Sequence, residues 1–350
     1  MAYFLGNNLL ELLGWLAELI VSSYFLSYGA EHLAQRYGAR FVGRTLLSIV
    51  TTLPEIAIVV YAASEGSYGT AIGAGLGSNL LMMTLGLALM LLVATTRLSK
   101  VPLKGVDVSM FRLDKIFLLI TAVASAALFV NGYSFIDGIV FAGLFITYLS
   151  MAFREMTLEA KRIQGRPPTQ QPVVDEFGKG IKKEGHLATA NTLLAFGGGA
   201  AGIFVGAAPF VHSLQGLSAD LGISVVVLAV VLSPIAGEMP EKISMILLAR
   251  KGAAGASIAV ANVLGSKILN NTLLLAVAVF GAVYHGGFGA IIGNSPALEY
   301  QVLLVTGVTI LALIPMFQKE IGLKVGMMLA AMYVTSIAAQ FVMPQDLRLK

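Results

Sequence analysis

The sequence predicts an all-α polytopic membrane protein, with about ten transmembrane helices arranged as two inverted five-helix repeats. Three observations predict this fold: an apolar composition, an uneven distribution of basic residues, and two similar acidic segments inside apolar stretches. Hydrophobic residues make up 57% of the 350 residues, charged residues make up 12%, and the mean hydropathy is +0.83. A soluble domain does not have this composition.

The apolar residues form long, uniform stretches. A helix needs about 20 apolar residues to cross the bilayer core, whereas the strands of a membrane barrel are short and alternate in polarity. The stretches therefore indicate helices. Their approximate centres are Ile20, Ile49, Leu85, Ala122, Gly143, Ala200, Val230, Leu274, Leu304 and Met332.

The basic residues predict the orientation. If the N-terminus lies outside and the spans alternate, most of the 23 Lys and Arg residues fall in inside loops and none falls in an outside loop. Cytoplasmic loops carry such an excess of basic residues. We therefore expect a multi-pass protein of the cell membrane with its N-terminus and its C-terminus outside. The same distribution explains the net charge of +4 without nucleic-acid binding.

One long polar stretch divides the chain. Residues 154–187 contain Pro167-Pro168 and several charges, which is typical of a cytoplasmic linker. The predicted repeats are residues 1–153 and 188–350. Because each half has an odd number of spans, the second half enters the membrane with the opposite polarity. Transporters built in this way form their substrate site near the membrane midplane, between the repeats.

Each half contains a Pro-Glu segment inside an apolar stretch. These segments are residues 51–55 (TTLPE) and 237–241 (GEMPE), and each precedes a Gly-Ser pair, Gly77-Ser78 or Gly265-Ser266. A carboxylate in hydrocarbon costs several kcal/mol unless it is paired or holds an ion. Proline frees a helix carbonyl, and irregular backbone at this depth is tolerated where it lines a cavity or is buried in protein. The duplication predicts one ion site built from two copies of one unit.

The residues near these segments are mainly oxygen donors. Helical spacing places Thr51 and Glu55 on one face, and it does the same for Glu238 and Glu241. Several carboxylates with hydroxyl and amide oxygens suit Ca²⁺, and we expect no other metal or cofactor. The candidate ligands are Glu55, Glu241, Thr51, Thr52, Ser78, Asn79, Glu238, Ser266 and Asn270.

Two acidic residues have a second interpretation. Lys242 follows Glu238 at i+4, so a neutral Glu-Lys pair explains both residues as well as a ligand role explains Glu238. Glu18 is expected near the outer interface rather than at the site.

The paired segments resemble the two α-repeats of the calcium/cation antiporter superfamily, which includes sodium/calcium exchangers and calcium/proton exchangers. The family pattern is a hydroxyl-rich turn ending in Pro-Glu, followed by a Gly-Ser-Asn opening. The resemblance implies that Glu55 and Glu241 are the central Ca²⁺ carboxylates. It also implies that the spans near Ile20 and Ala200 slide to alternate access. Four residues would supply supporting oxygens: Thr51, Thr52, Ser78 and Ser266.

The departures from the family pattern leave the counter-ion open. Sodium-coupled members usually have Asn where this chain has Met82, and often an acid where it has Asn270. Lys267 replaces the Asn of the second Gly-Ser-Asn opening. Calcium/proton exchangers commonly have His where this chain has Lys242.

We therefore expect a secondary-active antiporter, not an enzyme, that exchanges Ca²⁺ or a similar divalent cation for Na⁺ or H⁺ at the midplane. Its partners are these cations and the lipid bilayer, and the oligomeric state is open. No nucleophile-base pair or metal-binding His motif lies in a span. Two alternatives remain: a passive cation channel, and a transporter of another substrate in which Lys242 and Lys267 bind an anionic group.

Overall fold

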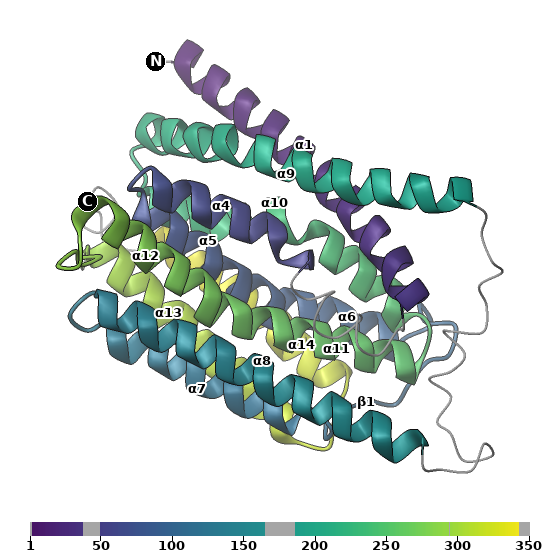
Figure 1. Ribbon diagram of the computed structural model, residues 1–350. Coiled ribbons are helices and arrows are strands. Elements are labelled where there is room, and N and C mark those ends of the chain that lie inside the picture. The colour runs from purple at the N-terminus through teal and green to yellow at the C-terminus, as the bar shows by residue number, and fades with distance from the viewer. Residues whose placement is uncertain (1, 38–49, 165–185, 294, 343–350) are drawn as a thin grey trace.

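The computed structural model describes residues 2–37, 50–164, 186–293 and 295–342, which form a bundle of long helices (Figure 1). Within the described residues, the first half of the chain contributes five helical rods, the third of which is continuous through a π-helical turn. Their elements are α1 (Ala2–Tyr37), α4 (Leu53–Ser64), α5 (Tyr68–Leu81), the π-helix η2 (Met82–Gly86), α6 (Leu87–Thr95), α7 (Arg112–Phe129) and α8 (Phe135–Gln164).

The second half repeats this order of rods. Its third rod also contains a π-helical turn, and its fourth ends in a 3₁₀ turn. Its elements are α9 (His186–Leu221), α10 (Val225–Ala249), α11 (Ala253–Leu269), the π-helix η5 (Asn270–Leu274), α12 (Leu275–Gly286), α13 (Pro296–Leu313), the 3₁₀ helix η6 (Ile314–Phe317) and α14 (Leu323–Val342).

The lengths and apolar composition of the rods fit a membrane. Within the described residues, seven helical stretches are long and apolar enough to cross a bilayer, and α4 and residues 225–239 form shorter apolar helices. The apolar windows of the rods at 68–95 and 253–286 are 83% buried in the protein, whereas those of α1 and α8 are only 22% buried. The predicted all-α polytopic membrane fold is confirmed. α8 continues to Gln164, so the start of the predicted linker is helical, and residues 165–185 lie outside the described residues.

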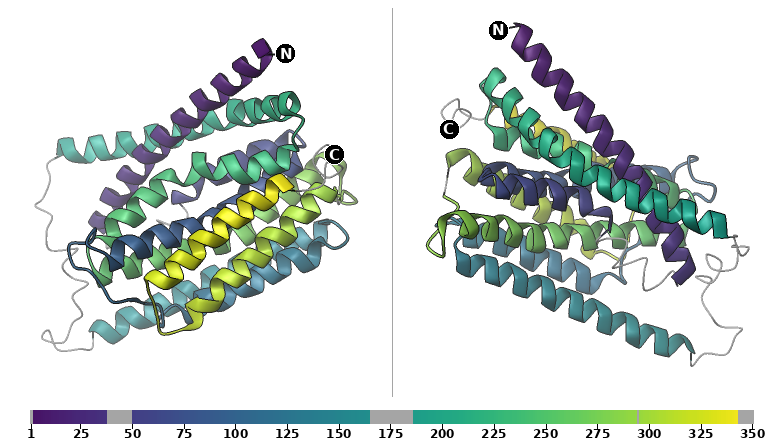
Figure 2. Two further views of the ribbon diagram at one scale, coloured as in Figure 1. Left: turned by 180° about the vertical axis from the view of Figure 1, so that it is seen from behind. Right: turned by 45° about the horizontal axis from the view of Figure 1, so that its top comes forward.

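The contacts between the halves are reciprocal. The first rods, α1 and α9, lie against each other (Figures 1 and 2). α1 also contacts α10, and α9 contacts α4 in the same way. α6 contacts α14, while α12 contacts α8. Each contact between a rod of one half and a rod of the other therefore has an equivalent contact with the halves exchanged, as a two-fold relation between the halves requires.

Two pairs of connecting segments show that the halves are inverted. Strand β1 (Val106–Asp107), between α6 and α7, pairs antiparallel with β2 (Glu320–Ile321), between η6 and α14. At the opposite end of the bundle, Tyr133 between α7 and α8 pairs with Ile292 between α12 and α13. In both cases the connection between rods three and four of one half meets the connection between rods four and five of the other. Only halves of opposite polarity produce this exchange.

A row of glycines brings α5 against α10. Gly69, Gly73 and Gly77 follow one another at intervals of four, and each faces residues of α10. A Cβ atom at Gly77 would lie 2.1 Å from the carbonyl oxygen of Val230. Small residues permit such close backbone approach between membrane helices. The contact places Ser78, the next residue, beside the acidic segment of α10.

The two π-helices begin at matching positions. η2 begins at Met82 and η5 at Asn270, in each case four residues after the Ser of the Gly-Ser pair. Single π-turns occur frequently at functional sites because they shift the side chains that follow relative to those before. The repeat therefore extends from the sequence to an unusual detail of the backbone.

Candidate functional site

Three glutamates are buried inside the described bundle, in helices that contact each other. Glu55 lies in the first turn of α4, and Glu238 and Glu241 lie on α10. Their relative exposures are 2%, 0% and 1%. Burying a charge without a partner is strongly unfavourable. The partners of each carboxylate therefore decide what the cluster can do.

Glu55 has the least satisfied carboxylate. Pro54 lies in the first turn of α4, where its missing N–H costs nothing, and this start directs Glu55 into the protein. Both carboxylate oxygens of Glu55 are buried, and neither has a hydrogen-bond partner among the described residues. Thr51 and Thr52 are buried immediately before it. A buried carboxylate in this condition is suited to binding a cation.

Gly237 of α10 makes room for the Glu55 carboxylate. A Cβ atom at position 237 would lie 2.9 Å from Cδ and 3.0 Å from Oε1 of Glu55. Gly237 occupies the position in the second repeat that Thr51 occupies in the first, four residues before the Pro-Glu glutamate. Because residue 237 has no side chain, the acidic segment of α10 can lie against the Glu55 carboxylate of α4.

We expect Gly237→Ala to weaken cation binding with little effect on folding. The clashing group is the end of a flexible side chain, so Glu55 rotates away and the backbones keep their positions. The expected result is an apparent Ca²⁺ affinity lowered about tenfold, equivalent to about 1.4 kcal/mol. Concentration-dependent uptake into proteoliposomes measures it, and thermal unfolding reports the fold. Gly307→Ala is the control, because a Cβ there meets nothing within 4 Å; an unchanged affinity in Gly237→Ala would contradict the placement of Glu55.

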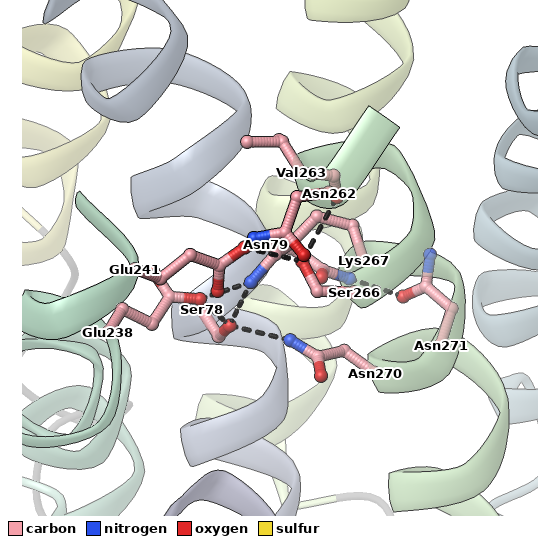
Figure 3. A network of polar contacts seen from close by, with 10 residues as sticks. All are labelled: Ser78, Asn79, Glu238, Glu241, Asn262, Val263, Ser266, Lys267, Asn270 and Asn271. Carbon is pink, nitrogen blue, oxygen red and sulfur yellow. Dashed lines mark hydrogen bonds and ion pairs between the residues drawn. The ribbon is translucent and has the colours of Figure 1, made fainter. Parts of the chain in front are cut away.

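Glu238 forms an ion pair with Lys267 of α11 (Figure 3). Ser78 of α5 donates a hydrogen bond to Glu238, and its Oγ accepts from Lys267 Nζ and from Asn270 Nδ2, each at 2.5 Å. One donated and two accepted bonds use the full capacity of a hydroxyl group. The i+4 pairing of Glu238 with Lys242 that the sequence allowed is wrong, because the partner comes from the neighbouring helix.

Glu241 is bound on one side only. Its Oε1 accepts hydrogen bonds from Asn262 Nδ2 at 3.0 Å and from Ser266 Oγ at 3.1 Å (Figure 3). Its Oε2 is buried without a hydrogen-bond partner among the described residues. α11 thus holds the carboxylate in a fixed orientation and leaves one oxygen for a ligand.

Asn262 was missed in the sequence because it has no counterpart in the first repeat, where Ala74 occupies its position. Comparison of the two repeats therefore did not indicate Asn262 as a residue of the site. Its spacing of four residues before Ser266, on the same helix face, was the signal available.

Two remaining candidates, Asn79 and Asn270, lie beside this cluster, whereas Glu18 lies apart from it. Asn79 Nδ2 donates to Asn271 Oδ1 at 2.5 Å, so Asn79 contacts an amide of the facing rod rather than a carboxylate. Asn270 has a buried Oδ1 without a partner in the described structure. Glu18 accepts a hydrogen bond from Ser22 at 2.7 Å and lies against α9, in the contact between α1 and α9.

The cluster is not a preformed metal centre of acidic side chains. Within the described ranges, no three His, Cys, Asp or Glu side chains converge closely enough to hold an ion by themselves. A cation here would take hydroxyl, amide or main-chain oxygens in addition to carboxylates. Such mixed oxygen sets are typical of Ca²⁺ sites, which use six to eight ligands.

Comparison with known proteins identifies the family. Residues 8–154 and 191–342 match the sequence profile of the family described as "Sodium/calcium exchanger protein". The chain belongs to this family. Its predicted membership of the calcium/cation antiporter superfamily is confirmed, and the chain is an integral, multi-pass membrane protein.

Relatives match almost the whole chain of this exchanger-family protein. It is 25% identical to the uncharacterized membrane protein MJ0091 of Methanocaldococcus jannaschii, over 94% of this chain and 96% of the relative. It is 24% identical to the putative antiporter CaxA of Alkalimonas amylolytica, over 79% of each chain.

Two solved structures share its fold. The crystal structure of the H⁺/Ca²⁺ exchanger CAX aligns with a TM-score of 0.74 at 20% identity, covering 96% of this chain and 82% of that one. The sodium-calcium exchanger NCX_Mj aligns with a TM-score of 0.60 at 23% identity, covering 96% and 99%.

Proposed function

We propose that this protein is a secondary-active antiporter that exchanges Ca²⁺, or a similar divalent cation, for Na⁺ or H⁺ at a midplane site between its repeats. The proposal rests on one observation: Glu55 and Glu241, at equivalent positions of inverted repeats, both have buried carboxylate oxygens without hydrogen-bond partners among the described residues. The family supports it, as do two structures of similar fold that are described as Ca²⁺ exchangers.

The available oxygens suit a divalent cation. Both oxygens of Glu55 and one of Glu241 are free of hydrogen bonds, and Glu238 Oε2 and Asn270 Oδ1 are in the same condition within the described structure. Thr51, Thr52 and Ser266 would contribute hydroxyl oxygens. Ca²⁺ and the counter-ion would bind the same carboxylates, so that occupancy by one excludes the other. This competition is what couples the two fluxes.

The α1–α9 pair is suited to provide alternating access. It forms a layer on one side of the bundle (Figure 2), and glycines of α9 lie directly on α1. A Cβ atom at Gly199 would lie 2.4 Å from the backbone nitrogen of Leu26. Because α1 contacts α10 and α9 contacts α4, movement of the pair would uncover the carboxylates from either end. Sliding of packed helices is a recognised mode of such transitions.

The charges at the two ends support the proposed orientation. Within the described residues, the end with β1 gathers basic residues alongside Asp107 and Glu320. The connections at the opposite end contain no Lys or Arg, and Asp220 there accepts a hydrogen bond from Asn8. By the positive-inside rule the β1 end would be cytoplasmic, and both termini would be outside. The basic residues at the β1 end are Arg97, Lys100, Lys104, Arg112, Lys115, Arg250, Lys251, Lys319 and Lys324.

The other two functions are less well supported. Lys267 is neutralised by Glu238, which leaves it poorly suited to bind an anionic substrate. A passive channel would need a continuous polar path, whereas the described carboxylates are buried in a closely packed bundle.

The proposal is tested by Ca²⁺ flux into proteoliposomes with Na⁺ and pH gradients imposed separately. We expect saturable uptake driven by one of the two gradients and competed by Mn²⁺. A channel would instead pass Ca²⁺ without an opposing gradient and carry a current that does not saturate at low concentration. Uptake that neither gradient drives, or that small carboxylates compete, would overturn the proposal.

A further inference from the structure

The ion pair at the site places an ammonium group where a cation would bind. Lys267 is 1% exposed, and its Nζ contacts Glu238 and the Ser78 hydroxyl in the interior of the protein (Figure 3). These three side chains come from three helices, α11, α10 and α5. The ammonium therefore contacts a carboxylate and a hydroxyl oxygen, as a bound monovalent cation would.

Both charged residues of the Glu238–Lys267 pair belong to the second repeat, and both have neutral counterparts in the first repeat. By position after the Gly-Ser pair, Lys267 corresponds to Asn79 of the first repeat. By position before the Pro-Glu glutamate, Glu238 corresponds to Thr52. A neutral hydroxyl and a neutral amide in one repeat are thus replaced by a carboxylate and an ammonium in the other, with no change in net charge.

Stability is a poor explanation for such a pair. The cost of removing two charges from water often exceeds their mutual attraction, and neutral groups of similar size are frequently as stable. The first repeat uses neutral groups at both positions. The pair also lies on the same helices as Glu241 and Ser266, next to the proposed cation ligands rather than at a distance.

We propose that the ammonium of Lys267 is a tethered monovalent cation of the transport site, which permanently fills the position between Glu238 and Ser78. The inference rests on the proposed function. With Lys267 in place, Glu238 has its cation, and the unpartnered oxygens of Glu55 and Glu241 remain for a divalent cation. Without Lys267, Glu238 would need a mobile cation of its own. Lys242, which is also buried, is the same in both cases. Lys267 thus determines how many ions the site takes.

The decisive variants change the charge balance in opposite ways. Lys267→Asn restores the amide of the first repeat but leaves Glu238 without its cation. The double variant Glu238→Gln with Lys267→Asn removes both charges. Lys324→Asn is a control that removes one positive charge from an exposed position at the β1 end. Each purified protein is melted in increasing NaCl, with choline chloride keeping the ionic strength constant.

A ligand that binds the folded state raises the melting temperature as its concentration increases, and the slope against the logarithm of the concentration grows with the number of ions bound. We expect the dependence on Na⁺ to be steeper for Lys267→Asn than for the wild type, the double variant and the control. If Lys267→Asn folds only when Na⁺ is present, the result supports the same conclusion. In proteoliposomes, the Hill coefficient for Na⁺ in Ca²⁺ exchange should be higher for Lys267→Asn than for the wild type, by up to about one.

Three results would overturn the inference: an equal Na⁺ dependence in all four proteins, a steeper dependence in the double variant as well, or a Lys267→Asn protein that Na⁺ does not rescue while the double variant folds. The melting experiment does not require transport. A wild type without gradient-driven Ca²⁺ uptake would therefore refute the proposed function, while the melting comparison still decides the role of Lys267.

Discussion

Glu55→Gln should abolish Ca²⁺ uptake driven by either a Na⁺ or a pH gradient. Gln has nearly the same shape as Glu, so the protein is expected to fold, but the amide has no charge and only one oxygen that can accept. Both oxygens of Glu55 are buried without hydrogen-bond partners in the described structure, so the substitution removes ligands without breaking a hydrogen bond. A loss of at least a hundredfold in apparent affinity corresponds to about 2.8 kcal/mol.

The measurement is the initial rate of Ca²⁺ uptake into proteoliposomes, with the amount of reconstituted protein determined for each variant. Glu65→Gln is the matched control, because Glu65 is the exposed residue that follows α4. Uptake by Glu55→Gln at the rate of the wild type would refute the assignment of Glu55 as a cation ligand. A loss in the control as well would indicate that α4 is sensitive to any substitution.

Gly77→Ala should prevent the protein from folding to its normal stability. The added methyl group would lie 2.1 Å from the carbonyl oxygen and 2.7 Å from Cα of Val230, which are backbone atoms that cannot rotate away. α5 and α10 would have to separate, and Ser78 would move away from Glu238. Overpacking that shifts the backbone costs about 1–3 kcal/mol, and a contact with main-chain atoms lies toward the upper end of this range. Thermal unfolding in detergent and the yield of monodisperse protein measure the effect.

Gly143→Ala provides the comparison for this variant. Gly143 lies within α8, and a Cβ atom there would meet nothing within 4 Å. Alanine is favoured over glycine in a helix by about 1 kcal/mol. The control should therefore be as stable as the wild type or slightly more stable. A Gly77→Ala protein with an unchanged melting temperature would show that α5 and α10 are not in backbone contact.

The fold and much of the cluster could be predicted from the sequence, because both depend on repeated local patterns. Apolar length and charge bias predicted the helices and their inversion, and the duplicated Pro-Glu and Gly-Ser elements predicted which residues meet. Ser78, Glu238 and Asn270 do lie together. The metal-ligand roles remain predictions.

The pairing of Glu238 was not predictable in the same way. Spacing along one helix allowed Lys242 as its partner, whereas helix packing supplied Lys267. The approach of α5 to α10 through Gly77 decides this, and periodicity within one helix carries no information about it. Asn271, the partner of Asn79, is also brought in by packing between rods from different halves.

The strand-like contacts at the two ends of the bundle have a mechanical consequence. Val106 with Ile321 at one end, and Tyr133 with Ile292 at the other, fasten connections of the two halves to each other by backbone hydrogen bonds. α1 and α9 take no part in either contact. The connections of the two halves are therefore joined at both ends of the bundle, and the α1–α9 pair lies outside these contacts. The movement of that pair proposed above would leave both backbone contacts in place.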